Sequence, residues 1–186
     1  MKYTYTKKKI YSNKQKFKKY WHIKKIFDII NYVRNKYRKC DHMIKIICIG
    51  KLKEKYLTDG VNDYLTRLRK YHKIDLIELP DSNIESEGNE ILKYISNKDY
   101  IISLAINGTQ LSSTELSEKI DKIFITNPNI TFIIGGSNGI RKDILDKSNM
   151  LLSFSKLTYP HGLFRLILLE QIYRSFKILN NESYHK

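Results

Sequence analysis

Cysteine is scarce in this 186-residue chain, and its scarcity narrows the classes of protein that the sequence can encode. The two cysteines, Cys40 and Cys48, have a spacing that fits no zinc-binding or redox motif. A disulfide framework is therefore not expected, and a reducing compartment is the natural setting. We expect no metal site.

Long apolar runs and the common nucleotide-binding motifs are also missing. A membrane-spanning helix needs about 18 to 20 consecutive apolar residues, and the uncharged run at 123–140 is interrupted by Asn, Pro and Gly. No G-x-G-x-x-G follows the first expected strand, and no G-x-x-x-x-G-K-[ST] occurs. The sequence therefore predicts neither a membrane protein nor an ordinary dinucleotide-binding or P-loop enzyme.

Positive charge is concentrated at the start of the chain. Residues 1–42 contain 14 Lys or Arg and two Asp, a net charge of +12, whereas residues 43–186 contain 20 Lys or Arg and 17 Asp or Glu, a net charge of +3. We divide the chain accordingly into a basic N-terminal extension, 1–42, and one domain, 43–186. A whole-chain net charge of +15 is thus no argument that the domain binds free nucleic acid.

Three interpretations of the extension stay open. It is an organelle-targeting segment, a basic arm that holds RNA, or a stretch upstream of a true translation start at Met43. It lacks the apolar h-region of a secretory signal. The expected location is cytoplasmic for a bacterial protein, and a plastid or mitochondrion if the extension is a targeting segment.

Residues 43–186 alternate between short β-branched runs and longer amphipathic ones. We expect strands at 44–49, 74–79, 100–106, 130–134 and 150–154, and helices at 54–71, 82–95, 112–124, 142–146 and 160–179. Capping boxes at 82–85 and 112–115 predict two of the helix starts. Such alternation implies a parallel sheet with helices on both faces, whose ligands bind beyond the carboxyl ends of the strands. Among the segments at those ends are Asn107-Gly108-Thr109 and Gly135–Ile140.

The last expected helix is apolar on every side. Its first turns carry leucine, isoleucine and phenylalanine at 163, 164 and 166–169. A helix that is apolar all round must be buried all round. One face can meet the sheet, and we expect the other to meet a second copy of the chain, giving a homodimer.

Four stretches together resemble one known family: "GKLKEKY", "IGGSNGI", "LSFSKLTYPHGLFRLILLEQIYRSFKI" and the terminal "YHK". The sequence from Met43 to Lys186 is similar to the RlmH family, SPOUT-class methyltransferases of large-subunit ribosomal RNA. The resemblance implies an α/β fold with a C-terminal trefoil knot, S-adenosylmethionine as cofactor, and a homodimer. It also implies methylation of N3 of a pseudouridine in helix 69 of 23S-type ribosomal RNA, on the assembled ribosome.

The resemblance also assigns residues by motif. The cofactor pocket would be lined by Leu104, Gly135, Phe154, Ser155, Lys156, Leu157, Thr158 and Tyr159. The polar positions facing the substrate would be His161, Arg165, Tyr184 and His185, with Arg165 and Lys186 as phosphate partners. The catalytic base is not assigned. The chain departs from the family in its 42-residue extension and in a shorter segment after Pro80.

Two alternatives remain at this stage. One is a related SPOUT enzyme that acts on transfer RNA, against which the Tyr184-His185-Lys186 terminus argues. The other is a non-catalytic ribosome-binding relative, against which the intact glycine loop and Thr158–His161 junction argue. The net charge of +3 in the domain favours a preformed ribosomal surface over free RNA, because phosphate neutralisation supplies most non-specific affinity.

Overall fold

Five strands and five helices alternate along the domain. The computed structural model describes Lys25 and residues 42–184, so our interpretations of the extension and of His185 and Lys186 lie outside the described residues. The strands are β1 (Met43–Ile49), β2 (Lys73–Leu79), β3 (Asp99–Gln110), β4 (Asn129–Ile134) and β5 (Met150–Ser153). The helices are α2 (Lys55–Leu68), α3 (Ile84–Tyr94), α4 (Ser113–Thr126), α5 (Lys142–Lys147) and α6 (His161–Leu179).

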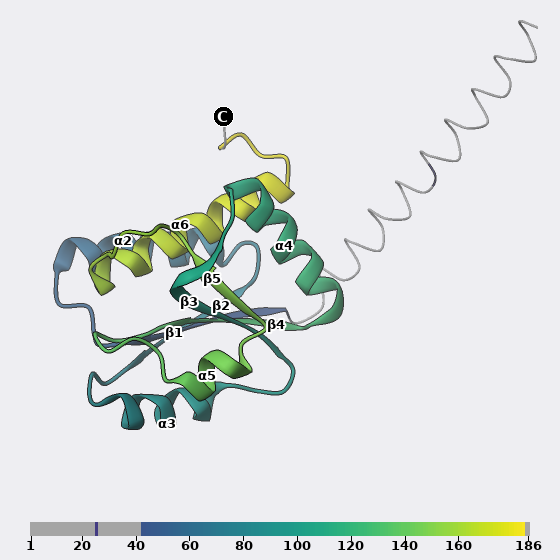
Figure 1. Cartoon of the computed structure of the whole chain (residues 1–186). Helices are drawn as coiled ribbons and strands as arrows, with labels where there is room; N and C mark the ends of the chain where they lie inside the picture. The colour runs from purple at the N-terminus through teal and green to yellow at the C-terminus, as the bar shows by residue number, and fades with distance from the viewer. Residues whose placement is uncertain (1–24, 26–41, 185–186) are drawn as a thin grey trace, which may run out of the picture. The chain divides into compact units, whose positions relative to one another are not determined.

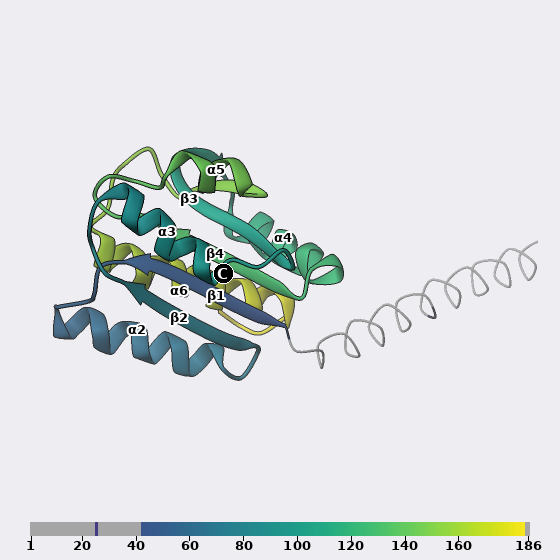
Figure 2. The same ribbon diagram turned by 90° about the horizontal axis from the view of Figure 1, so that it is seen from below.

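The strands form one parallel sheet in the order β2-β1-β4-β3-β5. Helices α2, α4 and α6 cover one face of the sheet, and α3 and α5 cover the other (Figures 1 and 2). This arrangement confirms the predicted parallel sheet with helices on both faces. The carboxyl ends of the strands lie at the same end of the domain as the start of α6 (Figure 2).

The side chains of β1 show why both faces need a cover. Ile44, Ile46 and Cys48 pack into the core under α2, α4 and α6, whereas Ile47 and Ile49 pack into a second core under α3 and α5. Alternate residues of a strand point to opposite faces, so a strand that is covered on both faces buries almost every residue. This includes Lys45, which forms an ion pair of 2.5 Å with Asp99. Burial raises the pKa of the Cys48 thiol to about 12, which leaves it protonated and unreactive at neutral pH.

Local details differ from the sequence-based expectations in three places. Strand β3 runs on to Gln110, and its pairing with β5 shifts so that Leu104 and Thr109 both lie opposite Leu152. The cap of α3 is the Asn83 side chain, which accepts a hydrogen bond from the Ser86 amide, rather than a box opened by Ser82. Pro160 is the N-cap of α6 and not its first helical residue, whereas the Ser112–Glu115 capping box of α4 is confirmed.

No helix among the described residues is long and apolar enough to cross a membrane. Within the same part of the chain, no group of three or more His, Cys, Asp and Glu is placed to hold a metal ion.

Candidate functional site

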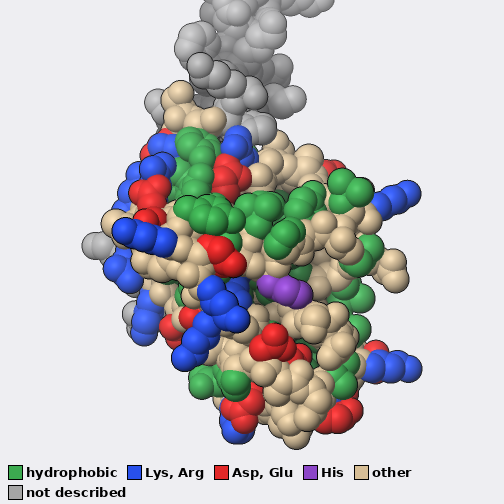
Figure 3. All heavy atoms as spheres, turned by 90° about the vertical axis from the view of Figure 1, so that its left-hand side faces the viewer, with side chains coloured by type: hydrophobic (Ala, Val, Ile, Leu, Met, Phe, Trp, Pro, Cys, Tyr) green, Lys and Arg blue, Asp and Glu red, His purple; other side chains and the backbone are tan. Residues whose placement is uncertain are grey.

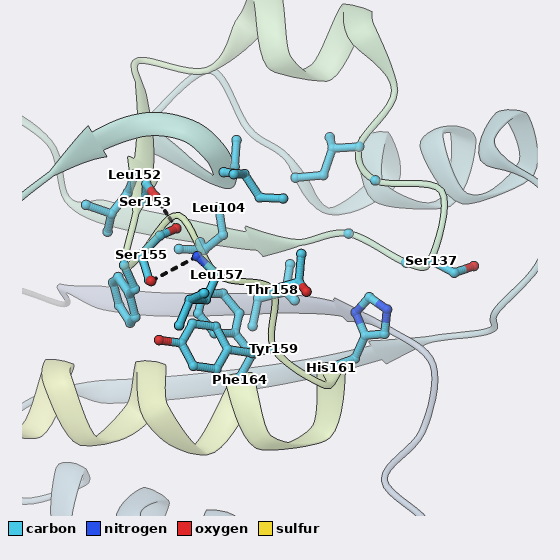
Figure 4. A pocket seen from close by; sticks show the side chains of 18 residues that line it. Leu104, Ser137, Leu152, Ser153, Ser155, Leu157, Thr158, Tyr159, His161 and Phe164 are labelled. Atoms are coloured by element: carbon cyan, nitrogen blue, oxygen red, sulfur yellow. Dashed lines mark hydrogen bonds between the residues drawn. The ribbon is translucent and has the colours of Figure 1, made fainter.

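A cavity of about 330 Å³ opens at the carboxyl ends of β3, β4 and β5. Its size suits a small organic ligand. Three segments and the start of α6 line it: residues 104–106 of β3, the glycine loop after β4, and the segment that joins β5 to α6 (Figure 4). We call residues 135–140 the glycine loop and residues 154–160 the junction segment. Seven of the eight predicted cofactor residues line the cavity: Leu104, Gly135, Phe154, Ser155, Leu157, Thr158 and Tyr159.

Two hydrogen bonds between residues close in sequence hold the junction segment in a turn. The Ser153 hydroxyl donates to the Ser155 carbonyl at 3.0 Å, and the Leu157 amide donates to the Ser155 hydroxyl at 2.9 Å (Figure 4). These bonds turn the chain back on itself directly after β5. Lys156, the eighth predicted cofactor residue, lies at this turn, is exposed, and does not line the cavity.

Aromatic side chains fix one wall of the cavity. The Phe164 ring on α6 packs edge-on against Phe154, with ring centroids 5.2 Å apart, and stacks on Tyr159 at 5.7 Å. Aromatic pairs at these distances stabilise beyond the area they bury. Phe154 and Tyr159 of the junction segment are therefore held in place by packing against α6. Phe164 was not predicted as a site residue.

The glycine loop is tightly folded. A Cβ at Gly135 would lie 2.4 Å from the carbonyl oxygen of Gly139. The Gly139 amide donates to the Gly136 carbonyl at 3.0 Å, and Gly139 has a φ of +81°, a conformation that favours glycine. The loop therefore brings bare backbone to the cavity wall.

The polar residues predicted to face the substrate do not gather at one place. His161, the first residue of α6, lines the cavity, is exposed, and lies toward the same end as Ser137 (Figure 4). Arg165 and Tyr184 do not line the cavity.

Our prediction that Arg165 meets RNA phosphate is corrected by the structure. Arg165 is only 2 % exposed. Its guanidinium forms an ion pair of 2.5 Å with Glu78 at the end of β2, and donates to the carbonyls of Ile49 and Gly50 at 2.8 and 2.7 Å. The helical spacing places Arg165 one turn after His161, on the face that packs against the sheet. Arg165 therefore ties the start of α6 to the ends of β1 and β2.

Tyr184 lies well away from the cavity of its own chain. Its hydroxyl donates to Glu170 at 3.2 Å and lies 3.4 Å from the Tyr64 hydroxyl, and its ring packs edge-on against Tyr173. Burial raises the pKa of Tyr184 above its usual range. Glu170 lies nine residues after His161, roughly 13 Å along the axis of α6. Tyr184 thus lies near the middle of α6 instead of at the cavity.

Sequence reasoning missed ten of the lining residues. They are Ala105, Ile106, Ile134, Gly136, Ser137, Gly139, Ile140, Leu152, Ser153 and Phe164. The stretch from Gly136 to Ile140 belongs to a segment that we had singled out as following a strand. The others lie on β3, β4, β5 or α6, where apolar residues indicate core packing as readily as a ligand site.

Comparison with known proteins places this architecture in a family. The sequence model of a family described as "Predicted SPOUT methyltransferase" matches residues 43–185. "Ribosomal RNA large subunit methyltransferase H" of Enterococcus faecalis is 48 % identical over 157 residues, covering 77 % of this chain and 99 % of that protein. The protein of the same name from Clostridium beijerinckii is 46 % identical with the same coverage. The chain therefore belongs to the SPOUT methyltransferase family, and within it to the RlmH family of large-subunit ribosomal RNA methyltransferases.

Solved structures resemble the chain more distantly. A probable methylase family protein from Haemophilus influenzae Rd KW20 is 14 % identical with a TM-score of 0.48, covering 78 % of this chain and 70 % of its own. The SpoU methyltransferase AviRb from Streptomyces viridochromogenes, in complex with AdoMet, is 8 % identical with a TM-score of 0.41, covering 76 % and 62 %.

Proposed function

We propose that this chain methylates N3 of a pseudouridine in helix 69 of 23S-type ribosomal RNA, on the assembled ribosome, with S-adenosylmethionine as methyl donor. The observation that supports the proposal most is the cavity: seven of the eight residues that the family resemblance assigned to cofactor binding line one small-molecule site. The names of the close relatives, which specify the RNA of the large ribosomal subunit, support the substrate class.

The cavity suits S-adenosylmethionine. The described residues that line it include no Lys, Arg, Asp or Glu, so no full positive charge lies beside the position of a sulfonium. Backbone amides and carbonyls of the junction segment and the glycine loop can hold the adenine and the ribose. When bound, S-adenosylmethionine supplies a methyl group on a positively charged sulfur, a good electrophile for N3.

The residues of the chain would act mainly by alignment. Holding the nucleophile in line with the methyl group converts a bimolecular step into an effectively unimolecular one. Phe164 fixes the aromatic wall, the two serine hydrogen bonds fix the junction segment, and the apolar lining excludes water. Arg165 would act as a positioning residue, since it fixes the start of α6 and with it His161.

His161 would contact the target base. It is exposed at the edge of the cavity, where an imidazole can hydrogen-bond the imide N3 or its flanking carbonyls. The reaction forms the N3–methyl bond, breaks the sulfur–methyl bond so that a neutral thioether leaves, and passes the N3 proton to water. The structure assigns no strong base to that proton, and a transiently ionised imide needs none.

A homodimer would complete the site. Leu163 on α6 is 37 % exposed, and Leu157 in the junction segment is 70 % exposed. Figure 3 shows apolar side chains running in a band across this end of the molecule, with acidic and basic ones interspersed. Because Tyr184 lies along α6 away from its own cavity, the terminal Tyr184-His185-Lys186 would serve the cavity of the partner, if α6 lies near the twofold axis.

The C-terminal trefoil knot is also a proposal. It is supported by the family membership and by the position of β5, which pairs with β3 on both sides of the register shift at residues 104–109. Stretching single molecules tests it, because a knotted chain would extend to a shorter contour length than its residue number allows. A full-length extension would contradict the knot.

Purified protein and unmodified substrates test the activity. Assembled ribosomes, isolated large subunits and transfer RNA are each incubated with the chain and methyl-labelled S-adenosylmethionine. The proposal expects label in ribosomal RNA of assembled ribosomes, at least tenfold above the other substrates. Label in transfer RNA alone would favour the related SPOUT activity, and cofactor binding without any transfer would favour a non-catalytic relative.

A further inference from the structure

A carboxylate is buried at the start of α3 without a full set of hydrogen bonds. Glu87 is 3 % exposed. Its Oε1 accepts the backbone amide of Ser82 at 2.9 Å, whereas its Oε2 has no partner among the described residues. An unpaired buried carboxylate oxygen is costly, because it loses its hydration without compensation. The hydrogen bond from the Ser82 amide accounts for the burial of Oε1, whereas nothing among the described residues accounts for the burial of Oε2.

This carboxylate lies directly against the glycine loop. A Cβ at Gly136 would be 3.0 Å from Glu87 Oε2 and 3.1 Å from Oε1. Gly136 itself lines the cavity. Since glycine has no side chain, only the backbone of one residue lies between the carboxylate and the cavity wall at this point.

Arg141, whose side chain packs on the same helix, is already paired with other acids. A Cβ at Gly88 would be 2.5 Å from the Arg141 guanidinium, so that side chain lies across the first turns of α3. Its hydrogen bonds go to Glu85, Asn89 and Asp143. Among the described residues, no ion pair involves Glu87.

We propose that Glu87 gives the pocket a preference for a cation, and so favours the sulfonium of S-adenosylmethionine over the neutral thioether of the product, S-adenosylhomocysteine. The proposal rests on the proposed function of the cavity. The neutral lining supports it, because no charged side chain of the lining stands between Glu87 and a ligand to cancel its field. Behind a bare backbone wall, that field is also poorly screened by solvent.

The size of the effect follows from Coulomb's law. Two unit charges on the order of 12 Å apart attract by about 1.4 kcal/mol at an effective dielectric constant of about 20. This corresponds to about a tenfold difference in affinity. Loss of the charge should therefore weaken binding of S-adenosylmethionine about tenfold and change that of S-adenosylhomocysteine less than about twofold.

The test is calorimetric titration of both ligands into the wild-type protein, Glu87→Gln and Glu85→Gln. Glutamine at 87 keeps an oxygen to accept the Ser82 amide and removes only the charge. Glu85 is the matched control, since it lies on the same helix, pairs with Arg141 and has a side chain that is 75 % exposed. The proposal expects Glu87→Gln alone to lose the preference for the cationic ligand.

Equal losses for both ligands, or no loss for either, would overturn the role of Glu87. Failure of the wild-type protein to bind either ligand would instead reject the proposed function on which it rests. If Glu87→Gln does not fold, as judged by circular dichroism, the wild-type protein is titrated with sinefungin, which carries an ammonium group where the cofactor carries its sulfonium. Sinefungin must then bind at least tenfold more tightly than S-adenosylhomocysteine, and any smaller ratio overturns the proposal.

Discussion

Replacing Gly135 by valine is expected to weaken cofactor binding strongly by displacing the glycine loop. The first atom of any side chain at this position would lie 2.4 Å from the carbonyl oxygen and 2.6 Å from the carbonyl carbon of Gly139. Both are backbone atoms, so no rotation of a side chain relieves the overlap. The two branches of valine add further overlap to that of the Cβ.

The expected loss can be estimated from the required movement. An ordinary contact for a Cβ begins at 3.4 Å, so the backbone at Gly139 must retreat by roughly 1 Å. Forcing extra groups into a packed site costs about 1 to 3 kcal/mol. The middle of this range, about 2 kcal/mol, corresponds to about thirtyfold weaker binding of S-adenosylmethionine. Because the strain lies in a loop at the rim of the sheet, the fold itself should persist.

Isothermal titration with S-adenosylmethionine measures the affinity, and circular dichroism with thermal unfolding checks the fold. Gly50→Asn is the control, since it enlarges a glycine that follows another strand and does not line the cavity, and the only atom within 4 Å of an added Cβ is Arg165 Nη2 at 3.9 Å. Asparagine also tolerates a φ of +83° better than most residues. We expect this control to bind within about threefold of the wild-type protein. Unchanged affinity in Gly135→Val would refute the argument that the tight glycine loop forms the pocket.

Four further outcomes are expected. Arg165→Met should lower the free energy of unfolding by about 3 kcal/mol in urea titration, because it breaks a buried ion pair, whereas Lys156→Met should change it by less than about 0.5 kcal/mol. Leu163→Glu should give monomers in analytical sedimentation, because a charge cannot be buried in an apolar interface. Deleting residues 184–186 should leave cofactor affinity unchanged and slow ribosome methylation at least tenfold, about 1.4 kcal/mol of transition-state stabilisation. Acidification should free the C-terminal segment, because a hydrogen bond from a lysine lowers the pKa of Glu182 to about 2.

For each of these four predictions, one experimental result would contradict the reasoning. Full stability of Arg165→Met would mean that the buried pair contributes nothing, and an active, folded dimer of Leu163→Glu would place the interface elsewhere. Normal methylation by the truncated chain would remove the tail from the site. For Glu182 the folded pKa is depressed, so its stabilising contribution is present above the ordinary glutamate range and is lost as the pH falls toward about 2. Hydrogen exchange of residues 177–184 that is the same at pH 6 and pH 2.5, after correction for the intrinsic rate, would contradict this.

The order of elements could be predicted because it depends on local patterns. The run Ile44–Ile49 is apolar at every position except Lys45, and the Ser112–Glu115 box marks a helix start through its own neighbours in sequence. Eight of the 18 residues that line the cavity could be predicted from motif resemblance: the seven cofactor residues and His161. Gly135 and the junction segment follow directly from strand ends, where ligands of parallel sheets bind.

Contacts between distant residues could not be predicted in this way. Arg165 meets Glu78, which is 87 positions earlier in the chain, so its burial depends on how α6 crosses the end of the sheet. The sequence did not single out Glu87, because its proximity to Gly136 exists only once α3 and β4 are packed together.

The same reasoning applies to the predicted dimer interface on α6. The sequence alone made Leu166 and Leu169 natural positions for a disrupting charge. In the structure Leu169 is fully buried within one chain, and Leu166 contacts Gly60 of α2. A charge at either position would disturb packing within one chain, and Leu163 is the informative choice because it is exposed. A helix that is apolar on every side must be buried, but its sequence does not show whether its own chain or a second copy covers each side.

Mass mapping of large-subunit ribosomal RNA from cells that lack this protein tests the central claim most directly. The account predicts that one methyl group disappears from a pseudouridine in helix 69 and returns when the intact chain is expressed. It also predicts that the Gly135→Val chain, expressed at the same level, does not restore it. Ribosomal RNA with an unchanged pattern of methylation in the deleted cells would contradict the account.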